Sequence, residues 1–291
     1  MKSAKAFSPG HITGFFEICP ASDPLSAGSR GAGLCISLGA TSEVRVQDSE
    51  RQSVDVRLDG KPGPAEVTVE AVRILLGQER KKVSVSTEFD LPVGQGFGMS
   101  AAGALSAALA LASALGIDGQ HAFEAAHIAE VEQGGGLGDI SAILRGGITI
   151  RERPGLPPIG KVLRIEGQPE VVLCVLGGGI PTKSVLGDAA KRKAINASGS
   201  KRVDMLLANP SLERLFSLSS EFAIESGLAS RKVLEAMNAA SKLGMATMSM
   251  LGNSVFAVGD TKGLERVLSD FGRVFRTRVN TEGARLIGPR A

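Results

Sequence analysis

The chain has 291 residues, of which 43% are hydrophobic and 22% are charged. This composition excludes long disorder and supports one large domain or two moderate ones. The net charge is only +3, and the chain contains no Trp and no Tyr. Because nucleic-acid binding needs a basic stripe with aromatic residues that stack on bases, we expect no nucleic-acid partner.

The three cysteines, Cys19, Cys35 and Cys174, show neither a CxxC pair nor a metal-ligand spacing. Their arrangement indicates free thiols in a reducing compartment. The segment Met1–Gly14 contains no apolar run of the kind that a secretory signal has. We therefore expect a cytoplasmic location.

Periodicity predicts strands in the first half of the chain, followed by helices. The expected strands are Gly33–Leu38, Ser42–Gln47, Ser53–Leu58, Lys82–Phe89 and Ile148–Arg153. The expected helices are Pro64–Leu76, Ser100–Leu115, Ala122–Glu132 and Asp139–Leu144. The segment Arg153–Pro158 is the best candidate for a linker, because proline and glycine interrupt helices and strands alike. We predict domains at residues 1–155 and 156–291.

The second half mixes both element types. The expected elements are a strand at Val171–Leu176, a helical stretch at Asp204–Leu243, strands at Thr247–Met250 and Ser254–Val258, a helix at Lys262–Phe271, and strands at Arg273–Val279 and Ala284–Ile287. Because strands and helices do not alternate strictly, the sequence predicts an α+β fold rather than a doubly wound sheet.

The segment Leu91–Ile117 contains no charged residue and is long enough to span a bilayer. It begins with a proline and several glycines, however, and its helical part is as rich in Ala, Ser and Gly as in Leu. We therefore expect a buried core helix and no membrane association.

A glycine-rich segment, Pro92–Ala102, joins a predicted strand to the start of that helix. The unpaired N–H groups and the dipole of a helix N-terminus attract anions, and glycines let phosphate oxygens approach the backbone. The candidate phosphate-binding residues are Pro92, Gly94, Gly96, Phe97, Gly98, Met99, Ser100, Ala101 and Ala102. The segment is not a Walker A loop, since no Lys-Ser/Thr pair follows the glycines, and its G-x-G-x-G spacing does not fit a Rossmann fingerprint.

The same segment resembles the second motif of the GHMP kinase superfamily, P-x-x-x-G-L-G-S-S-A-A, with Phe97 and Met99 replacing Leu and the first Ser. The resemblance implies a two-domain fold, in which an N-terminal mixed α/β domain carries the ATP-binding loop and the C-terminal α+β domain is ferredoxin-like. It also implies ATP and Mg²⁺, with the hydroxyl of Ser100 among the Mg²⁺ ligands.

Two acidic residues, Glu130 and Asp139, flank the glycine turn Gly134–Gly138. Taken alone, Asp139 is an ordinary helix N-cap and Glu130 a solvated position on a helix. In the superfamily, a helix Glu binds the metal and an Asp after a glycine-containing loop orients or deprotonates the acceptor hydroxyl. The resemblance therefore implies Glu130 as a metal ligand and Asp139 as the catalytic base, with Glu132 as the second candidate for the metal.

The N-terminal block Pro9–Glu17 resembles the first motif of the superfamily, with His11 at the position that usually holds Arg or Lys. Together with Gly28–Gly33, Gly136–Asp139 and Met250–Asn253, this block resembles one branch of the superfamily, the archaeal pantoate kinases. That resemblance implies phosphorylation of D-pantoate to 4-phosphopantoate for coenzyme A synthesis, and a homodimer.

A small hydroxy acid needs a cation for its carboxylate, preferably an arginine. Arg151 is the first candidate and Arg30 the second. His11, His127 and Thr182 complete the candidate substrate ligands. A surface ion pair for Arg151 and a core role for His127 are the competing interpretations.

Three alternatives to this function are open. The chain could act on another acceptor such as shikimate, homoserine or mevalonate, or it could be a non-catalytic nucleotide-binding regulator with the same fold. A dinucleotide oxidoreductase is disfavoured by the glycine spacing.

Overall fold

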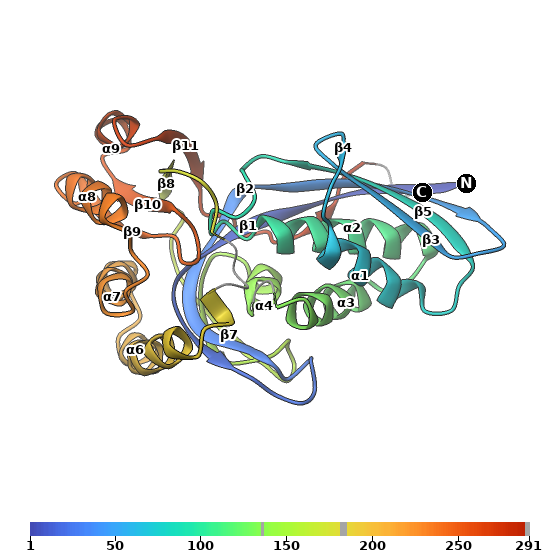
Figure 1. Ribbon diagram of the computed structural model, residues 1–291, viewed down its shortest axis with the longest axis horizontal. Helices are drawn as coiled ribbons and strands as arrows, with labels where there is room; N and C mark the ends of the chain where they lie inside the picture. The colour runs from blue at the N-terminus through green and yellow to red at the C-terminus, as the bar shows by residue number, and fades with distance from the viewer. Residues whose placement is uncertain (135–136, 181–184, 289–291) are drawn as a thin grey trace.

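The computed structural model describes residues 1–134, 137–180 and 185–288, and it confirms an α+β fold with two sheets (Figure 1). The strands are β1 Lys2–Cys19, β2 Gly28–Asp48, β3 Ser53–Leu58, β4 Lys61–Pro62, β5 Lys81–Phe89, β6 Ile148–Arg153, β7 Lys161–Ile165, β8 Glu170–Val175, β9 Gly244–Met248, β10 Ser254–Gly259, β11 Arg273–Arg278 and β12 Arg285–Leu286. The helices are α1 Glu66–Leu76, α2 Met99–Leu115, α3 Gly119–Glu132, α4 Asp139–Arg145, α6 Ala189–Ala208, α7 Leu212–Glu225, α8 Arg231–Ala240 and α9 Thr261–Ser269.

Two long antiparallel strands, β1 and β2, form the centre of the larger sheet, whose order is β12-β1-β2-β5-β3-β4. The first part of β2 pairs with β6, which in turn pairs with the edge strand β7. The sequence predicted two short strands within β2 and none within β1. The strand β1 contains Pro9, Gly10 and Gly14, which normally interrupt strands. Register shifts between Pro9 and Gly10 and between Thr13 and Phe15 accommodate these residues as irregularities in the ladder.

The helices α1 to α4 cover one face of this sheet, and α2 is buried along nearly its whole length (Figure 1). Its many alanines allow the neighbouring elements to approach closely on all sides, which is typical of a helix enclosed in a core. Among the helices that the structure describes, none has both the length and the apolar character needed to cross a membrane.

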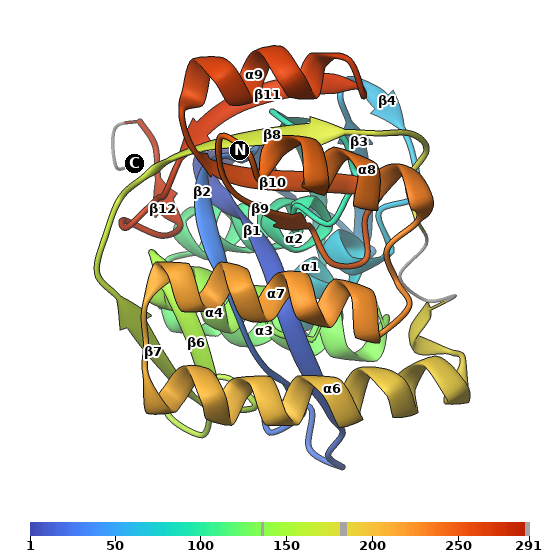
Figure 2. The same cartoon turned by 90° about the vertical axis from the view of Figure 1, so that its left-hand side faces the viewer.

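The C-terminal sheet has the order β11-β8-β10-β9 and is antiparallel throughout. This strand order and the sequence of elements around it are ferredoxin-like, as predicted. Figure 2 shows α6 to α9 on the side of the molecule that faces the viewer, which is the left-hand side of Figure 1.

The stretch predicted as helical at Asp204–Leu243 consists of the end of α6 followed by α7 and α8. The hydroxyl of Ser211 accepts a hydrogen bond from the N–H of Arg214, and that of Ser230 accepts one from the N–H of Val233, so each new helix begins at a serine cap. The first part of α6 and the strand β7 were not predicted. The domain division at residue 155 stays a prediction; β7 and β12 follow it in sequence and pair with strands of the larger sheet.

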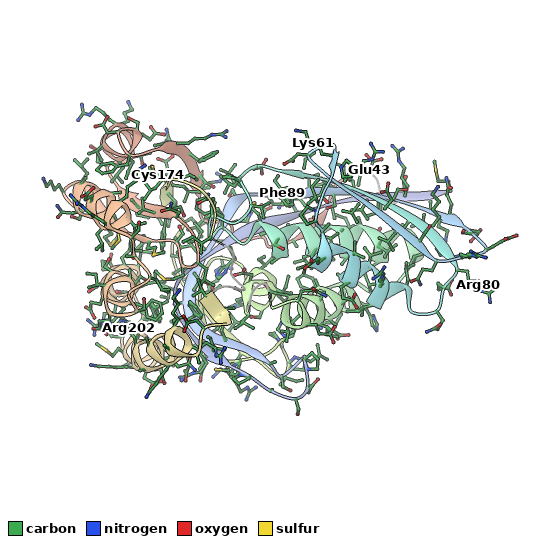
Figure 3. The ribbon with its side chains drawn as sticks, in the orientation of Figure 1. Glu43, Lys61, Arg80, Phe89, Cys174 and Arg202 are labelled. Atoms are coloured by element: carbon green, nitrogen blue, oxygen red, sulfur yellow. The ribbon has the colours of Figure 1, made fainter. Side chains whose placement is uncertain are left out.

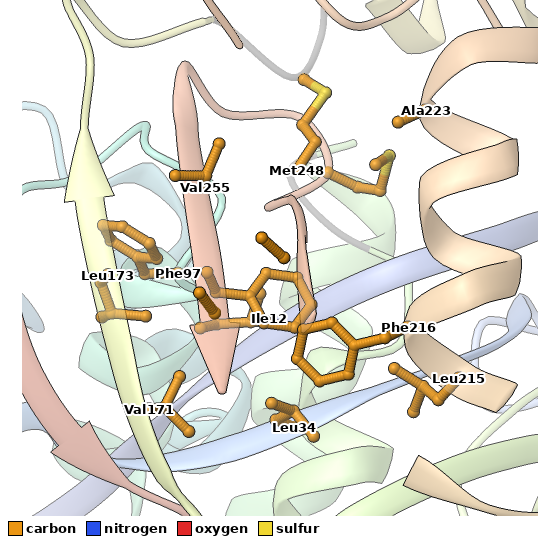
Figure 4. Close-up of a cluster of buried hydrophobic side chains, with 14 of the residues drawn as sticks. Ile12, Leu34, Phe97, Val171, Leu173, Leu215, Phe216, Ala223, Met248 and Val255 are labelled. Atoms are coloured by element: carbon orange, nitrogen blue, oxygen red, sulfur yellow. The ribbon is translucent and has the colours of Figure 1, made fainter. Parts of the chain in front are cut away.

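A hydrophobic core between the two sheets includes Phe97 of the glycine-rich segment. Figure 4 shows Phe97 close to Ile12 of β1, Leu173 of β8 and Val255 of β10. Because Phe97 is only 1% exposed, the glycine-rich segment is anchored by a buried aromatic side chain that touches both halves of the molecule. This anchor fixes the position of the start of α2.

The helices α6 and α7 are joined by the buried guanidinium of Arg202 (Figure 3). Its Nε donates to the carbonyl of Leu218 at 2.9 Å, its Nη1 donates to the carbonyl of Ser198 at 2.9 Å, and its Nη2 lies 2.8 Å from Glu225.

We expect Arg202→Ala to lower the free energy of unfolding by about 2–3 kcal/mol, because buried carbonyls lose a charged donor. Urea unfolding measures this change. The exposed neighbour Lys201→Ala should stay within about 0.5 kcal/mol of the wild type, and an equal loss in both variants would contradict the role of Arg202.

Candidate active site

A single pocket of about 500 Å³ lies where β1, the start of α2, the start of α4 and the turn after β9 meet. It brings together most of the residues predicted from the sequence. Those that line it are His11, Gly94, Gly96, Phe97, Gly98, Met99, Ser100, Ala101, Glu130, Asp139 and Arg151. Pro92 and Ala102 do not line it; Ala102 is fully buried beneath the glycine-rich loop.

The glycine-rich loop is shaped by contacts with β1. The N–H of His11 donates to the carbonyl of Phe97 at 3.1 Å. Gly98 has a φ of +66°, and a Cβ there would lie 2.8 Å from the carbonyl oxygen of His11, so only glycine fits without strain. Beyond Gly98 the helix α2 begins at Met99, and the exposed Ser100 lies in its first turn. The geometry is that of an anion site at a helix N-terminus.

A turn of the C-terminal half supports the same loop from the other side. The hydroxyl of Ser254 donates to the carbonyl of Gln95 at 2.6 Å, and the amide of Gln95 donates to the carbonyl of Gly177 at 2.9 Å. A Cβ on Gly252 would collide with the carbonyl of Gln95. The loop therefore depends on residues 82 and 159 positions later in the chain.

Asp139 lies at the first position of α4, and its Oδ1 is 2.7 Å from Nδ1 of His11. Because a carboxylate only accepts hydrogen bonds, Nδ1 carries the proton. Burial lowers the pKa of His11, although the hydrogen bond with Asp139 opposes this shift, so the imidazole is neutral at physiological pH. The other oxygen, Oδ2, lies 3.4 Å from the point where a Cβ on Gly98 would be, and so faces the glycine-rich loop.

Glu130 and Arg151 are both buried at the inner end of the pocket. Burial and the negative charge of Asp139 raise the pKa of Glu130 well above its usual value, and the backbone N–H of Ile140 and the positive charge of Arg151 oppose this shift only partly. Neither carboxylate oxygen of Glu130 makes a hydrogen bond of ordinary geometry within the described part of the chain. A buried carboxylate without donors is costly unless a cation or a proton neutralises it.

The guanidinium of Arg151 has incomplete hydrogen bonding. Its Nε donates to the hydroxyl of Ser29 at 3.3 Å and its Nη2 to the hydroxyl of Thr13 at 3.5 Å, while Nη1 has no partner among the described residues. Burial lowers the pKa of Arg151, but from so high a starting value that the side chain keeps its charge. A buried arginine with a free N–H at a pocket is suited to bind a carboxylate.

Three more of the predicted residues lie outside the pocket, and a fourth is not described. Arg30 does not line the pocket; it pairs with Glu17 at 3.0 Å and with Asp204 at 2.7 Å. His127 is buried outside the pocket, where its Nε2 lies 3.1 Å from the carbonyls of Pro24 and Ala27, as in the core interpretation. Glu132 is exposed and does not line the pocket. Of the two candidate metal ligands, only Glu130 lines the pocket. Thr182 lies outside the described residues.

Sequence reasoning missed two groups of pocket residues. Around Arg151 these are Thr13, Phe16, Ser29, Met250 and Leu251. At the opposite end the pocket has an apolar lining formed by Leu58, Pro64, Ala65, Val67, Phe89 and Val93. Phe89, which Figure 3 labels near the start of α2, lies against Gly103 of that helix. The first group belongs to the blocks Pro9–Glu17, Gly28–Gly33 and Met250–Asn253, which carry the resemblance, but the sequence does not show which residues of each block face the pocket. The apolar group has no local sequence signal, because its members are ordinary strand, turn or helix residues.

The residues present fit a magnesium ion. Mg²⁺ is usually held by one or two carboxylates together with substrate phosphates and water. Glu130 supplies a buried carboxylate whose oxygens make no hydrogen bond of ordinary geometry with the described residues, and Ser100 supplies a hydroxyl at the helix start in the same pocket. The described residues contain no group of three or more His, Cys, Asp or Glu side chains that could hold a metal by themselves. Such a site would therefore depend on oxygens from a bound nucleotide.

The comparisons with known proteins agree with this geometry. The GHMP kinases N terminal domain family matches residues 66–147. The pantoate kinase of Methanocaldococcus jannaschii is 34% identical over 269 residues, which cover 90% of this chain and 95% of that protein. The pantoate kinase of Methanospirillum hungatei is 36% identical over 294 residues, which cover 98% of this chain and 97% of that protein. A solved structure described as a phosphotransferase related to the CoA biosynthesis pathway has a TM-score of 0.88 and 33% identity, with 99% of both chains covered.

The chain therefore belongs to the GHMP kinase family. Within that family the relatives that it matches over nearly its whole length are pantoate kinases. The predicted resemblance to the superfamily and to this branch is confirmed.

The contact between Gly252 and the glycine-rich loop leads to a prediction. We expect Gly252→Ala to raise the Kd for ATP by about tenfold or more, because the new methyl group must displace the carbonyl of Gln95 and with it the loop. Isothermal titration calorimetry measures this change. Gly119→Ala is the control, since a Cβ there meets only Leu109, at an ordinary 3.7 Å. Unchanged ATP affinity in a folded Gly252→Ala protein would show that the turn does not shape the loop.

Proposed function

We propose that the protein transfers the γ-phosphoryl group of ATP to the primary hydroxyl of D-pantoate, forming 4-phosphopantoate and ADP in coenzyme A biosynthesis. The observation that carries this proposal is the placement of a hydrogen-bonded carboxylate, Asp139, and a buried, incompletely paired arginine, Arg151, in the pocket that contains the glycine-rich loop. The match to pantoate kinases over nearly the whole chain supports D-pantoate as the acceptor.

Asp139 is proposed to take the proton of the acceptor hydroxyl. Its Oδ1 is held by His11, which leaves Oδ2, on the side of the glycine-rich loop, free to accept that proton. As the proton leaves, the acceptor oxygen forms a bond to the γ-phosphorus and the bond from that phosphorus to the β-phosphate oxygen breaks. His11 positions the carboxylate and stays neutral.

The nucleotide is proposed to bind along the pocket, with its phosphates at the glycine-rich loop and its base at the apolar end near Phe89. The N–H groups at the start of α2 would stabilise the charge on the phosphates. Ser100 and Glu130 would hold Mg²⁺, which when bound neutralises phosphate charge.

Arg151 is proposed to bind the carboxylate of the acceptor. Its Nη1 has no other partner within the described residues, and the hydroxyls of Thr13 and Ser29 lie beside the same guanidinium. Because Arg151 and Asp139 both line this end of the pocket, an acceptor bound by its carboxylate would present its other end to the catalytic carboxylate. His11 is thus a positioning residue rather than a direct ligand of the acceptor.

A cytoplasmic location and a homodimer also belong to the proposal. The reducing compartment is supported by the three free cysteines, two of which are buried. Burial raises the pKa of the Cys35 thiol to about 12 and that of Cys174 to about 11, so both are unreactive at neutral pH. The homodimer rests on resemblance to the family alone.

The acceptor is tested by measuring ADP release from Mg-ATP with D-pantoate, shikimate, homoserine and mevalonate. We expect turnover with D-pantoate only, because the relatives that the chain matches over nearly its whole length are pantoate kinases. Homoserine is the most demanding comparison, since it carries a carboxylate and a primary hydroxyl at the same separation as D-pantoate does. Turnover with a different acceptor would retain a kinase and reject D-pantoate. ATP binding without turnover on any acceptor would favour a nucleotide-binding regulator.

The role of Asp139 is tested by Asp139→Asn, which keeps the shape of the side chain but cannot accept the hydroxyl proton. We expect turnover to fall by about 10²- to 10⁴-fold, with the ATP affinity measured by calorimetry nearly unchanged. The control is Glu132→Gln, which removes an exposed charge outside the pocket and should retain turnover. Near-normal turnover of Asp139→Asn would contradict its role as the base, and a loss in Glu132→Gln would move the metal site to that residue.

A further inference from the structure

We propose that three apolar side chains, Phe16, Met250 and Leu251, recognise the two methyl groups that D-pantoate carries beside its reacting hydroxymethyl group. We call these three residues the apolar wall. All three line the pocket. This inference rests on the proposed function, because it concerns how the same site selects its acceptor.

Two independent contacts place Met250 and Phe16 of the apolar wall beside Arg151. The N–H of Met250 donates to the carbonyl of Thr13 at 3.0 Å, and the hydroxyl of Thr13 lies 3.5 Å from Nη2 of Arg151. A Cβ on Gly31 would lie 2.8 Å from the same Nη2 and 3.0 Å from Cα of Phe16. Met250 and Phe16 therefore come close to the guanidinium from two different segments of the chain.

The backbone of Leu251 provides a further reason to assign its side chain a function. Leu251 has a φ of +62°, and it is one of two residues other than glycine with a positive φ in the described part of the chain. This conformation is unfavourable for a residue with a bulky side chain, and glycine or asparagine would adopt it more easily. Strained residues that persist at a pocket are candidates for a functional contact.

The chemistry of the acceptor matches this arrangement. In D-pantoate a carboxylate and a hydroxymethyl group stand at opposite ends, and the carbon next to the hydroxymethyl group carries both methyl groups. With the carboxylate at Arg151 and the hydroxyl at Asp139, that carbon lies between the two residues. Its methyl groups need an apolar surface, since leaving them against polar groups forfeits the free energy of removing them from water. The apolar wall supplies such a surface in this part of the pocket.

The Phe16 ring is also held firmly in place. It is 4% exposed, and its centroid lies 5.9 Å from that of Phe222 on α7. A Cβ on Gly199 of α6 would collide with the carbonyl of Phe16, so the helix lies directly against this part of β1. A rigid apolar surface discriminates between acceptors better than a mobile one, because it cannot collapse onto a smaller ligand.

The test compares D-pantoate with (R)-2,4-dihydroxybutanoate, which has the same carboxylate and both hydroxyls but lacks the two methyl groups. The measured quantity is the ratio of kcat/KM for the two acceptors, determined on one enzyme preparation. This ratio does not depend on the fraction of enzyme that is correctly folded. We expect the wild type to prefer D-pantoate by about 100-fold or more, since one methylene group in an apolar pocket gives about 10- to 200-fold.

In Phe16→Leu, Met250→Ala and Leu251→Gly we expect this preference to fall by about tenfold, mainly through lower kcat/KM for D-pantoate. Leu251→Gly should also keep or raise the Tm, because glycine tolerates the positive φ. A role in stability alone would lower the Tm and leave the preference unchanged. Phe216→Leu is the matched control, since this core phenylalanine packs against Phe256 at 5.0 Å and does not line the pocket; its preference should equal that of the wild type.

The outcomes separate the two proposals. An unchanged preference in all three wall variants, with a wild type that phosphorylates D-pantoate, would overturn the apolar wall and leave the proposed function in place. A wild type that turns over both acceptors equally well would also overturn it. Absence of any D-pantoate turnover by the wild type would overturn the proposed function itself, and the wall assignment with it.

Discussion

The pocket depends on a set of ionisable side chains that compensate one another in a largely buried corner. Removing a charge from water is costly, so Glu130 and Arg151 are tolerated there only because their neighbours offset part of the cost, and His11 is buried in its neutral form. Burial lowers the pKa values of His11 and Arg151 and raises that of Glu130; Asp139 opposes the first two shifts and Arg151 opposes the third. Among the described residues, hydrogen bonding is incomplete at Glu130, at Nη1 of Arg151 and at Nε2 of His11. The proposed function assigns a ligand at the first two of these places.

This corner exists only because both halves of the chain contribute to it. The glycine-rich loop and the acidic pair lie within or near the segment 66–147 that matches the family. The loop is nevertheless held by Phe97 in the core between the sheets and by the turn around Gly252. The ferredoxin-like half therefore contributes to the proposed nucleotide site as well as to the proposed acceptor site. A change in that half, far from the proposed catalytic side chain, would act on the glycine-rich loop through the carbonyl of Gln95.

The sequence was sufficient to predict residues of the pocket where those residues belong to one continuous segment. The glycine-rich loop, Glu130 and Asp139 each belong to a local motif, and the structure brings them into one pocket. The residues of the acceptor end could not be predicted individually, because Thr13, Ser29 and Met250 come from three distant segments. The motif blocks that contain them do not show which of their side chains face the pocket. The strand β1 was missed for a related reason: its proline and glycines predict a loop, and only pairing with β2 over its whole length makes it a strand. The choice between Arg30 and Arg151 likewise depended on which of them packing would bury.

Because His11 is neutral, the positive charge at this end of the pocket comes from Arg151 and not from position 11. The related motif usually holds Lys or Arg there, which would place a second cation next to Asp139. A neutral imidazole keeps the hydrogen bond that orients Asp139 but adds no charge to attract an anion. Arg151 is then the cation on which an anionic acceptor can place its carboxylate at this end of the pocket. In the proposed complex, an acceptor with a carboxylate at one end and a hydroxyl at the other would be bound in one orientation, with the hydroxyl toward Asp139, because the reverse orientation would set two carboxylates against each other.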